Sequence, residues 1–250
     1  MRKRRHGPAY SPADAGPVDA GPVGAGPVGA GPVGAGPVGA GPVETGCTGR
    51  DAGCTGRVAG CTGRVAGLLL AAGAGRRYGG PKALVAFRGQ PLVLRSRAVL
   101  VAAGCAPVLV VVGARAEAVT ELVRSGVVRN PAWPTGMGSS LRAGLAALEV
   151  TTASAAVVTL VDMPGVGVEA VRRVAAAARP DALVVGGYHG DRWGHPVLLG
   201  RAHWAGAAAS ATGDRGARDY LSQHRDIVTV VPCGDVADAQ DLDVPPKIQR

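Results

Sequence analysis

Residues 65–82 read VAGLLLAAGAGRRYGGPK and fall into three parts. The apolar run 65–71 is short, opens on a β-branched residue and ends at small residues, which predicts a strand buried on both faces of a parallel sheet. The small residues 72–75 let backbone N–H groups approach a ligand with no side chain in the way. Two arginines and Lys82 follow at a distance from which cations can close over phosphate oxygens. The stretch therefore predicts a strand followed by a triphosphate-binding loop.

Two well-known glycine fingerprints do not fit this loop. A GxGxxG motif would place Tyr78 at its last glycine position, where a bulky ring prevents close packing of helix on strand. A Walker loop needs Gly-Lys-Ser/Thr, whereas Lys82 follows Pro81 and precedes Ala83. The loop alone leaves one alternative open, a plain glycine-rich turn with solvated basic residues.

Apolar runs and helical patterns alternate along the rest of the chain. Such alternation indicates βαβ units and a mostly parallel sheet. We therefore expect a single α/β domain of Rossmann-like, three-layer architecture. The expected strands are 65–71, 83–87, 107–112, 126–129, 155–161, 181–186 and 227–231; the expected helices are 91–103, 116–124, 139–148, one from about 168, and 213–221; an irregular hairpin-like insertion is expected at 188–199.

The segment 130–145 reads NPAWPTGMGSSLRAGL. Its prolines prevent regular structure up to Gly136, after which Ser139 or Ser140 can cap a helix. A helix N-terminus at Gly138, Ser139 and Ser140 would offer N–H and hydroxyl groups to the polar edge of a ligand. A plain helix cap is the alternative, although it does not explain the neighbouring tryptophan and methionine.

Asp162 directly follows the strand expected at 155–161. An aspartate at the C-terminal end of a parallel strand lies in the crevice where ligands of open α/β sheets bind. A magnesium ion that bridges phosphate oxygens takes hard carboxylate ligands. Asp162 is therefore a candidate metal ligand, and capping of the helix from about 168 is its alternative role.

The loop pattern Leu-Ala-Ala-Gly-x-Gly-x-Arg-x-Gly-x-Pro-Lys, residues 70–82, resembles the signature of the MobA-like nucleotidyltransferases, and within them most resembles the molybdenum cofactor cytidylyltransferases. Tyr78 departs from the methionine usual there. Further blocks are similar to the family's segments in the same order, and they are Asn-Pro-x-Trp-x-x-Gly-Met-Gly-Ser-Ser-Leu from 130, Asp-Met-Pro from 162, Gly-His-Pro-Val-Leu from 194, Gly-Asp-x-Gly-Ala-Arg from 213 and Asp-x-Asp from 241. The residues after the last block, Val244-Pro245-Pro246, differ from the usual Thr-Pro-Glu-Asp.

The resemblance implies transfer of CMP from CTP to a terminal phosphate of molybdopterin, with loss of pyrophosphate. It implies catalytic roles for Lys82, Arg77 and Asp162 and a Mg²⁺ site at Asp162 and Asp243. Contacts to the second substrate would come from His195 and Asp214. Nucleotide contacts would come from Leu70, Ala71, Ala72, Gly73, Ala74, Gly75, Gly138, Ser139 and Ser140. A molybdenum hydroxylase or its chaperone is the expected recipient of the product.

Neither the base nor the reaction class is settled by the resemblance. Guanylyl-transferring relatives generally carry Leu-Ala-Gly-Gly at the strand end, so the Cβ of Ala72 favours the smaller pyrimidine base. The same fold also serves transferases that use GTP or a sugar or polyol phosphate. An NAD(P)H reductase is a further candidate, since some relatives carry the name nicotine blue oxidoreductase, and so is a cofactor-binding chaperone without enzymatic activity.

Residues 1–64 differ in composition from the remainder, 65–250, which we expect to hold the folded domain. A five-residue Ala-Gly-Pro-Val-Gly repeat and a seven-residue Gly-Cys-Thr-Gly-Arg-Val-Ala repeat lack the apolar content that ordering requires. We therefore expect this segment to be disordered, and short perfect repeats of this kind also suggest a start codon assigned too early.

Charge and cysteine usage exclude several classes of function. The formal charge is +9, but basic residues are scattered and aromatic residues are not interleaved with them, which argues against nucleic-acid binding. No CxxC motif occurs, so a zinc site is not expected, and Cys105 and Cys233 are expected to be reduced and buried. No apolar run has the length of a membrane span. We expect a cytoplasmic protein.

Overall fold

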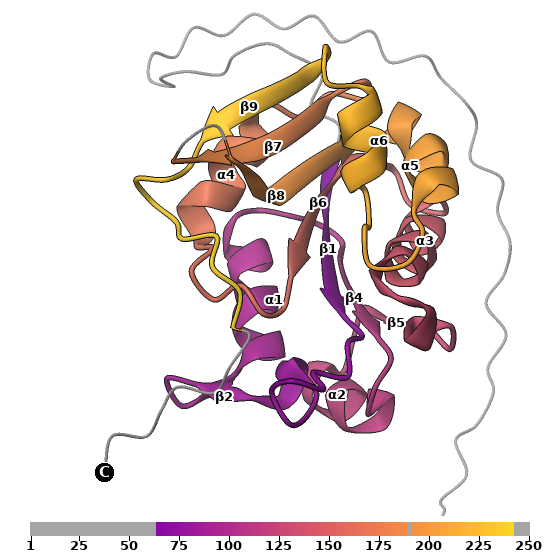
Figure 1. The fold of residues 1–250 in the computed structure, drawn as a ribbon, viewed down its shortest axis with the longest axis vertical. Helices are drawn as coiled ribbons and strands as arrows, with labels where there is room; N and C mark the ends of the chain where they lie inside the picture. Colours follow the sequence, from indigo (N-terminus) through magenta and orange to yellow (C-terminus); the bar gives the residue numbers. More distant parts are fainter. Residues whose placement is uncertain (1–63, 190–191, 243–250) are drawn as a thin grey trace, which may run out of the picture. The chain divides into compact units, whose positions relative to one another are not determined.

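The computed structural model describes residues 64–189 and 192–242, and its main feature there is a seven-stranded sheet in the order β5-β4-β1-β6-β8-β7-β9 (Figure 1). Its strands are β1 (Arg64–Ala71), β4 (Val108–Val112), β5 (Val127–Arg129), β6 (Ala153–Leu160), β7 (Leu183–Tyr188), β8 (Arg192–Gly200) and β9 (Val228–Pro232). The helices are α1 (Leu92–Ala102), α2 (Ala116–Val123), α3 (Met137–Leu148), α4 (Val168–Ala176), α5 (Trp204–Ser210) and α6 (Arg218–Gln223). Disorder was predicted for residues 1–64, of which only Arg64 is described, and Arg64 is instead the first residue of β1. Residues 1–63 and Asp243, for which a metal-binding role was predicted, lie outside the described residues.

Strand β1 lies in the interior of the sheet, parallel to both of its neighbours, β4 and β6. Successive side chains of a strand point to opposite faces, so Leu69 and Ala71 enter one hydrophobic core while Leu68 and Leu70 enter the other. Each of the four is at most 7% exposed. The prediction of a strand buried on both faces is confirmed.

Helices cover both faces of the sheet, so the predicted three-layer α/β architecture is confirmed. Buried residues of α1, α2 and α4 share one core cluster, and those of α3, α5 and α6 share the other. Figure 1 shows the two sets on opposite sides of the sheet. This division explains why alanine, valine and leucine suffice for the cores, because helices cover the strands from both sides.

The segment predicted as an irregular insertion is instead regular, because most of it forms strand β8. This strand pairs antiparallel with β6 on one side and with β7 on the other. Its apolar half, residues 196–200, is fully buried, whereas its first half is only partly buried. The sequence pattern was misleading because His195, Pro196 and two glycines interrupt the strand, although pairing on both sides holds it extended.

Two further predictions differ from the structure, and one helix of the structure had no counterpart among the predictions. The strand predicted at 83–87 is reduced to β2 (Ala86–Phe87), which pairs with β3 (Gln90–Pro91) in a tight hairpin after a 3₁₀ turn at Lys82–Leu84. Arg88 and Gly89 both have positive φ in that hairpin, as a two-residue turn requires. Helix α6 begins five residues later than predicted, because positive φ at Gly213 and Gly216 keeps the preceding segment in turns. Helix α5 was not predicted.

The N-terminus of α3 also differs from its prediction. The helix begins at Met137. The residue before it, Gly136, is the N-cap and has no side chain that could accept a hydrogen bond from the first turn. Asp214, 77 residues further along the chain, instead accepts a hydrogen bond from the Met137 N–H at 3.3 Å. Ser139 and Ser140 lie inside the first turn and are buried.

Candidate functional site

The loop after β1 curls around the carbonyl oxygen of Gly75. This oxygen accepts hydrogen bonds from the N–H groups of Tyr78, Gly79 and Gly80 at 2.9, 3.0 and 3.1 Å. Gly75 has a φ of +58°, and a Cβ there would lie 1.9 Å from the Gly80 oxygen. Only glycine fits this position, because both the backbone conformation and the close approach exclude a side chain.

The same curl leaves the other side of the loop available. Among the described residues, nothing accepts a hydrogen bond from the N–H groups of residues 73–77. Consecutive unpaired N–H groups in a turn form a concavity that binds anions. Arg77 is exposed in this turn and makes no ion pair with another described residue. The loop therefore has the donors that a phosphate-binding site requires.

Lys82 and Asp162 meet at the carboxyl edge of the sheet. Lys82 opens the 3₁₀ turn that follows the loop, and Asp162 lies just past β6. Strands β1 and β6 pair in register up to Leu70 and Leu160, so the segments after them leave the sheet side by side. Lys82 Nζ donates to Asp162 Oδ2 at 2.9 Å, and the two side chains are only 14% and 24% exposed. Two residues 80 positions apart therefore form one partly buried charged pair.

A segment after β9, residues 233–242, runs back across the sheet edge toward this pair, and we call it the strap (Figure 1). Its start is fixed to α4, because the Arg173 guanidinium donates to both carboxylate oxygens of Asp235, at 2.7 and 2.9 Å. This bidentate contact lowers the pKa of Asp235 and raises that of Arg173. Arg173 also donates to the Pro232 carbonyl oxygen, which ends β9.

The rest of the strap is held by backbone contacts. The Asp238 N–H donates to the Gly165 oxygen at 3.3 Å, and the Leu242 N–H donates to the Asp162 backbone oxygen at 2.8 Å. A Cβ on Gly165 would lie 2.5 Å from the Asp238 oxygen. The last described residue of the strap, Leu242, therefore lies directly beside Asp162.

The serines predicted to bind nucleotide are engaged inside the protein. The Asn130 side-chain amide donates to the hydroxyls of Ser139 and Ser140 at 2.8 and 3.1 Å. The Ser139 hydroxyl in turn donates to backbone oxygens of Ala132 and Gly136. This network shapes the loop before α3, and sequence reasoning missed Asn130 because its role depends on three-dimensional contacts.

Gly138, the third residue predicted at this helix N-terminus, is also engaged. Its N–H donates to the Gly213 oxygen at 2.8 Å. A Cβ there would lie 2.7 Å from the backbone of Ala211. The start of α3 is therefore packed against the turn that precedes α6.

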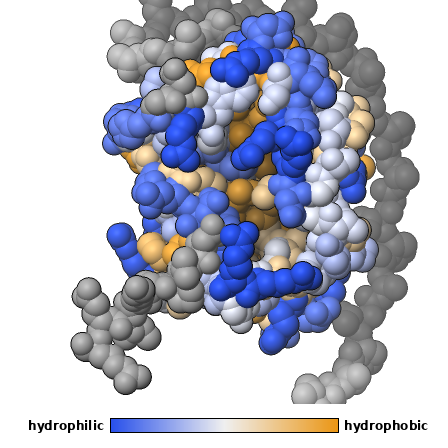
Figure 2. Space-filling model, in the orientation of Figure 1, coloured by the Kyte–Doolittle hydropathy of each residue, from blue (hydrophilic) through white to orange (hydrophobic). Residues whose placement is uncertain are grey.

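A cavity of about 1080 Å³ opens beside the Lys82–Asp162 pair, over the edge of β6, β7 and β8. Leu70, Met137 and Leu160 contribute apolar surface to it, and the strap forms part of its wall. Figure 2 shows apolar surface at the bottom of a hollow bordered by hydrophilic residues. His195 and Asp214, both predicted to contact a second substrate, line the cavity. The structure therefore brings these two residues together, although they come from β8 and the turn before α6.

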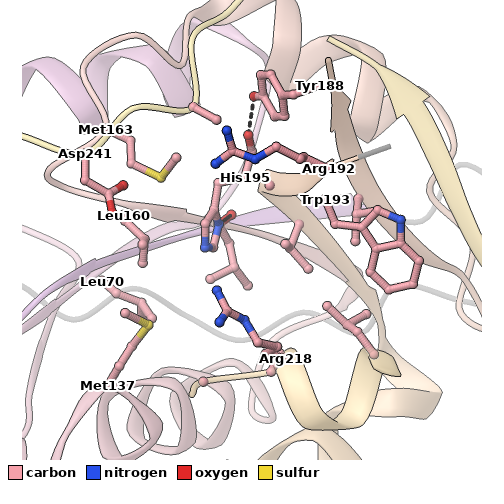
Figure 3. A pocket seen from close by; sticks show the side chains of 18 of the residues that line it. Leu70, Met137, Leu160, Met163, Tyr188, Arg192, Trp193, His195, Arg218 and Asp241 are labelled. Carbon is pink, nitrogen blue, oxygen red and sulfur yellow. Dashed lines mark hydrogen bonds between the residues drawn. The ribbon is translucent and has the colours of Figure 1, made fainter. Parts of the chain in front are cut away.

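His195 is fixed within the cavity by β6. Its Nδ1 lies 3.0 Å from the Val158 carbonyl oxygen, so Nδ1 carries the proton and the neutral ring keeps Nε2 as an acceptor. Burial lowers the pKa of His195, which keeps the ring neutral near pH 7. The Tyr188 hydroxyl donates to the His195 backbone oxygen (Figure 3), and burial raises the pKa of Tyr188 to about 12. Tyr188 therefore stays protonated as a donor.

Two observations limit which metal sites are available. No group of three or more His, Cys, Asp or Glu side chains gathers within the part of the chain that the structure describes. Asp162 Oδ1 makes no hydrogen bond to any described residue, whereas Oδ2 is held by Lys82. A metal ion at Asp162 would therefore depend on one or two carboxylates, with other ligands from bound phosphate and water.

Comparisons with known proteins agree with this geometry. The sequence model of the family described as "MobA-like NTP transferase domain" matches residues 67–228 of this chain. Nicotine blue oxidoreductase of Paenarthrobacter nicotinovorans is 37% identical over 193 residues, which are 73% of this chain and 94% of that protein. None of the helices in the described residues could cross a membrane.

This chain is also similar to several solved structures. Rv0371c from Mycobacterium tuberculosis H37Rv is 26% identical with a TM-score of 0.61, over 74% of this chain and 94% of that one. A structure of the same protein contains manganese and is 25% identical, with a TM-score of 0.54 over 75% and 94% of the two chains. The inositol-1-phosphate CTP transferase of T. maritima shares the fold, with a TM-score of 0.55 and 16% identity over 75% and 94% of the chains. From the matched domain, the relative of known name and the shared fold, we conclude that this chain belongs to the MobA-like NTP transferase family.

Proposed function

We propose that this protein transfers CMP from CTP to the phosphate of a molybdopterin acceptor and releases pyrophosphate. The observation that carries the proposal is the contact between Lys82 and Asp162, 2.9 Å apart beside the phosphate-binding loop. In the reaction, an acceptor phosphate oxygen bonds to the α-phosphorus of CTP while the bond from that phosphorus to the bridging oxygen breaks. Pyrophosphate leaves with the bonding electrons, so the site must bind and neutralise developing negative charge.

The loop after β1 supplies the contacts that a triphosphate needs. The N–H groups of residues 73–77, which have no acceptor among the described residues, can bind phosphate oxygens without reorganisation. Lys82 adds a partly buried cation, and exposed Arg77 can fold over the outer phosphates. Positioning and charge neutralisation account for most of the catalysis of phosphoryl transfer, so these groups suffice without a covalent intermediate.

The residues around Asp162 fit a Mg²⁺ ion carried by the nucleotide. Magnesium keeps several waters and is commonly bound through one or two carboxylates together with substrate phosphates. Asp162 offers one such carboxylate with Oδ1 free of described partners, and we propose Asp243 as the second ligand. When bound, the ion would offset the negative charge that develops on the leaving pyrophosphate.

The cavity is suited to the acceptor. Its volume of about 1080 Å³ reaches the upper end of typical ligand sites, so it can take a second substrate beside the nucleotide. Apolar residues at its bottom suit a flat heterocycle. The neutral His195, with Nε2 as an acceptor, suits N–H groups of such a ring better than a cation would.

We propose cytosine as the base because space near the loop is limited. Ala72 is 4% exposed, and its carbonyl oxygen accepts the Ala114 N–H at 3.0 Å. Trp133 packs against Gly113, where a Cβ would lie 2.5 Å from the indole side chain and 2.8 Å from the Ala72 oxygen. With this close packing beside it, the Cβ of Ala72 leaves less room for a purine than a glycine at the same position would leave.

Pyrophosphate release from molybdopterin, CTP and Mg²⁺ tests the proposal. We expect Lys82→Ala and Asp162→Asn to lower kcat/KM by about 10²–10³, because each removes a charge that acts on the transition state. Asp162→Asn keeps the side-chain shape, so this variant should still fold and unfold cooperatively, although it loses the ion pair to Lys82. Arg179→Ala, which removes an exposed ion pair at 3.6 Å to Asp181, is the control. Turnover retained in both site variants would refute the assignment.

A second candidate function follows from the 37% identity to nicotine blue oxidoreductase, a relative covered over 94% of its length. In that case the chain would bind NADPH or NADH and reduce an aromatic substrate in the same cavity. Titration with NADPH distinguishes the two functions. Micromolar binding of NADPH, with oxidation in the presence of a dye and no pyrophosphate release from CTP, would favour the reductase.

Recipient and location follow from the proposed product. A cytidylated molybdopterin would be delivered to a molybdenum hydroxylase or its chaperone. We place the reaction in the cytoplasm, where the buried Cys105 and Cys233 would stay reduced.

A further inference from the structure

Several charged side chains that line the cavity already have a partner. Arg215 pairs with Asp219 at 3.2 Å. Asp214 accepts the Met137 N–H, and Asp238 accepts the N–H of Gln240 at 3.0 Å. Arg215 is therefore neutralised by a carboxylate of the fold, and the two aspartates each already accept a backbone N–H.

Arg192 and Arg218 differ from this group. The guanidinium group of neither residue makes an ion pair or a hydrogen bond with another residue in the described ranges 64–189 and 192–242. Arg192 opens β8 and Arg218 opens α6, so they come from opposite sides of the cavity. Figure 3 shows both side chains directed into the cavity with His195 between them. Two cations that face one cavity, and that lack an anionic partner among those residues, favour binding of a negatively charged ligand.

The two arginines do not serve the reacting phosphates. The cavity lining includes Leu70 and Leu160 but neither Lys82 nor Asp162. Asp162 follows the end of β6, and Lys82 opens the 3₁₀ turn after the phosphate-binding loop. Arg192 opens β8 and Arg218 opens α6, whereas the reactive pair follows β1 and β6. A ligand that reaches both places must therefore carry two separate anionic groups.

We propose that Arg192 and Arg218 form a second anion site, which holds a negatively charged group of the acceptor remote from the phosphate that reacts. The inference rests on the proposed function, because it assigns the cavity to the acceptor. It specifies the acceptor's chemical class: a flat heterocycle with one anionic substituent for the two arginines and a phosphate at its other end. Arginine suits this role because its planar fork binds carboxylate-like groups through two parallel hydrogen bonds.

Binding of two pterins by calorimetry tests the inference without CTP, metal or turnover. Pterin-6-carboxylate carries the anionic group, and 6-hydroxymethylpterin is its neutral counterpart. The wild type should bind the carboxylate at least about tenfold more tightly, since a charge-assisted hydrogen bond contributes roughly that factor. Arg192→Gln and Arg218→Gln should each remove most of this preference and leave affinity for the neutral pterin unchanged. Arg215→Gln is the matched control, because this arginine lines the same cavity but is already paired.

Several outcomes would overturn the inference. They are equal affinity of the wild type for both pterins, no binding of either, or an equal loss of preference in the Arg215 control. Weaker NADPH binding in the two site variants, with pterin binding unaffected, would also overturn it, because the arginines would then serve a dinucleotide. The pyrophosphate assay fails or succeeds independently of these measurements, so failure of the proposed transfer and failure of the anion site are distinguishable.

Discussion

Replacement of Gly165 by alanine should impair metal-dependent turnover without changing any charged or catalytic group. An ideal Cβ at this position lies 2.5 Å from the Asp238 backbone oxygen and 2.9 Å from the Asp238 Cβ. Backbone atoms cannot rotate away as a long side chain can, so the strap must move. A Cβ on Gly167, two residues later, would have no other atom within 4 Å, so this position provides the matched control.

The size of the effect follows from the contacts of the strap. Relief of the overlap requires a shift of about 0.8 Å, since ordinary carbon–oxygen contacts begin near 3.3 Å. The Asp238–Gly165 hydrogen bond is the first contact to be lost, and the bond from Leu242 to Asp162 at 2.8 Å is the next. At about 1 kcal/mol each, these losses predict a destabilisation of about 1–2 kcal/mol and a fall in Tm of about 3–6 °C. A shift of this size at the acidic end of the strap should cost up to about 10²-fold in kcat.

The assay is pyrophosphate release as a function of Mg²⁺ concentration, for the wild type, Gly165→Ala and Gly167→Ala. We expect the Mg²⁺ concentration at half-maximal rate to rise in Gly165→Ala, because a displaced strap no longer holds Leu242, and with it the proposed ligand Asp243, in place next to Asp162. The Gly167 variant should behave as the wild type. Equal Mg²⁺ requirement and equal kcat in the two variants would show that the strap does not position the metal ligands.

The remaining predictions concern the loop, the buried histidine and base choice. Gly75→Ala should weaken CTP binding by at least about tenfold in a calorimetric titration, because a Cβ there would lie 1.9 Å from the Gly80 oxygen. Gly80→Ala is the control and should change CTP binding little, because a Cβ at Gly80 would have no other atom within 4 Å. Burial lowers the pKa of His195 in the folded state, so its contribution to stability is complete above about pH 6.5 and is lost as the pH falls toward the folded-state pKa. The stability difference between wild type and His195→Asn, from urea unfolding, should therefore shrink on acidification by at most about 1.4 kcal/mol per pH unit, and a constant difference would contradict a buried neutral ring. Ala72→Gly should raise GTP affinity relative to CTP by severalfold, and unchanged relative affinity would argue against base selection at this residue.

Local patterns predicted the fold class and the elements around the phosphate loop. The apolar run 65–71 forms a central strand because its residues alternate between two cores, and both cores could be inferred from the absence of polar residues. Asp162 was located from its place after an apolar strand, since parallel strands end at one edge of a sheet. Its place in one site with Lys82 was implied by the family resemblance, and their direct contact came from the structure.

The elements that were predicted wrongly depend on contacts between distant parts of the chain. Strand β8 contains a proline and glycines that oppose regular structure locally, yet pairing with both β6 and β7 keeps it extended. Helix α3 has no cap from the residue that precedes it. Its first N–H instead donates to Asp214, 77 residues away along the chain. Helix α5 went unrecognised because its short alanine-rich sequence has no clear amphipathic period, and tertiary packing of Trp204 holds it in place.

The sequence by itself determined the α/β class, the glycine-rich loop with its basic residues and the candidate carboxylate, because each depends on residues that are neighbours along the chain. Only the tertiary structure decided which distant side chains meet: the strap against Gly165, Asn130 against two serines, and Arg192 across the cavity from Arg218. Strand register and helix packing set these encounters, and neither is encoded in a short window of residues.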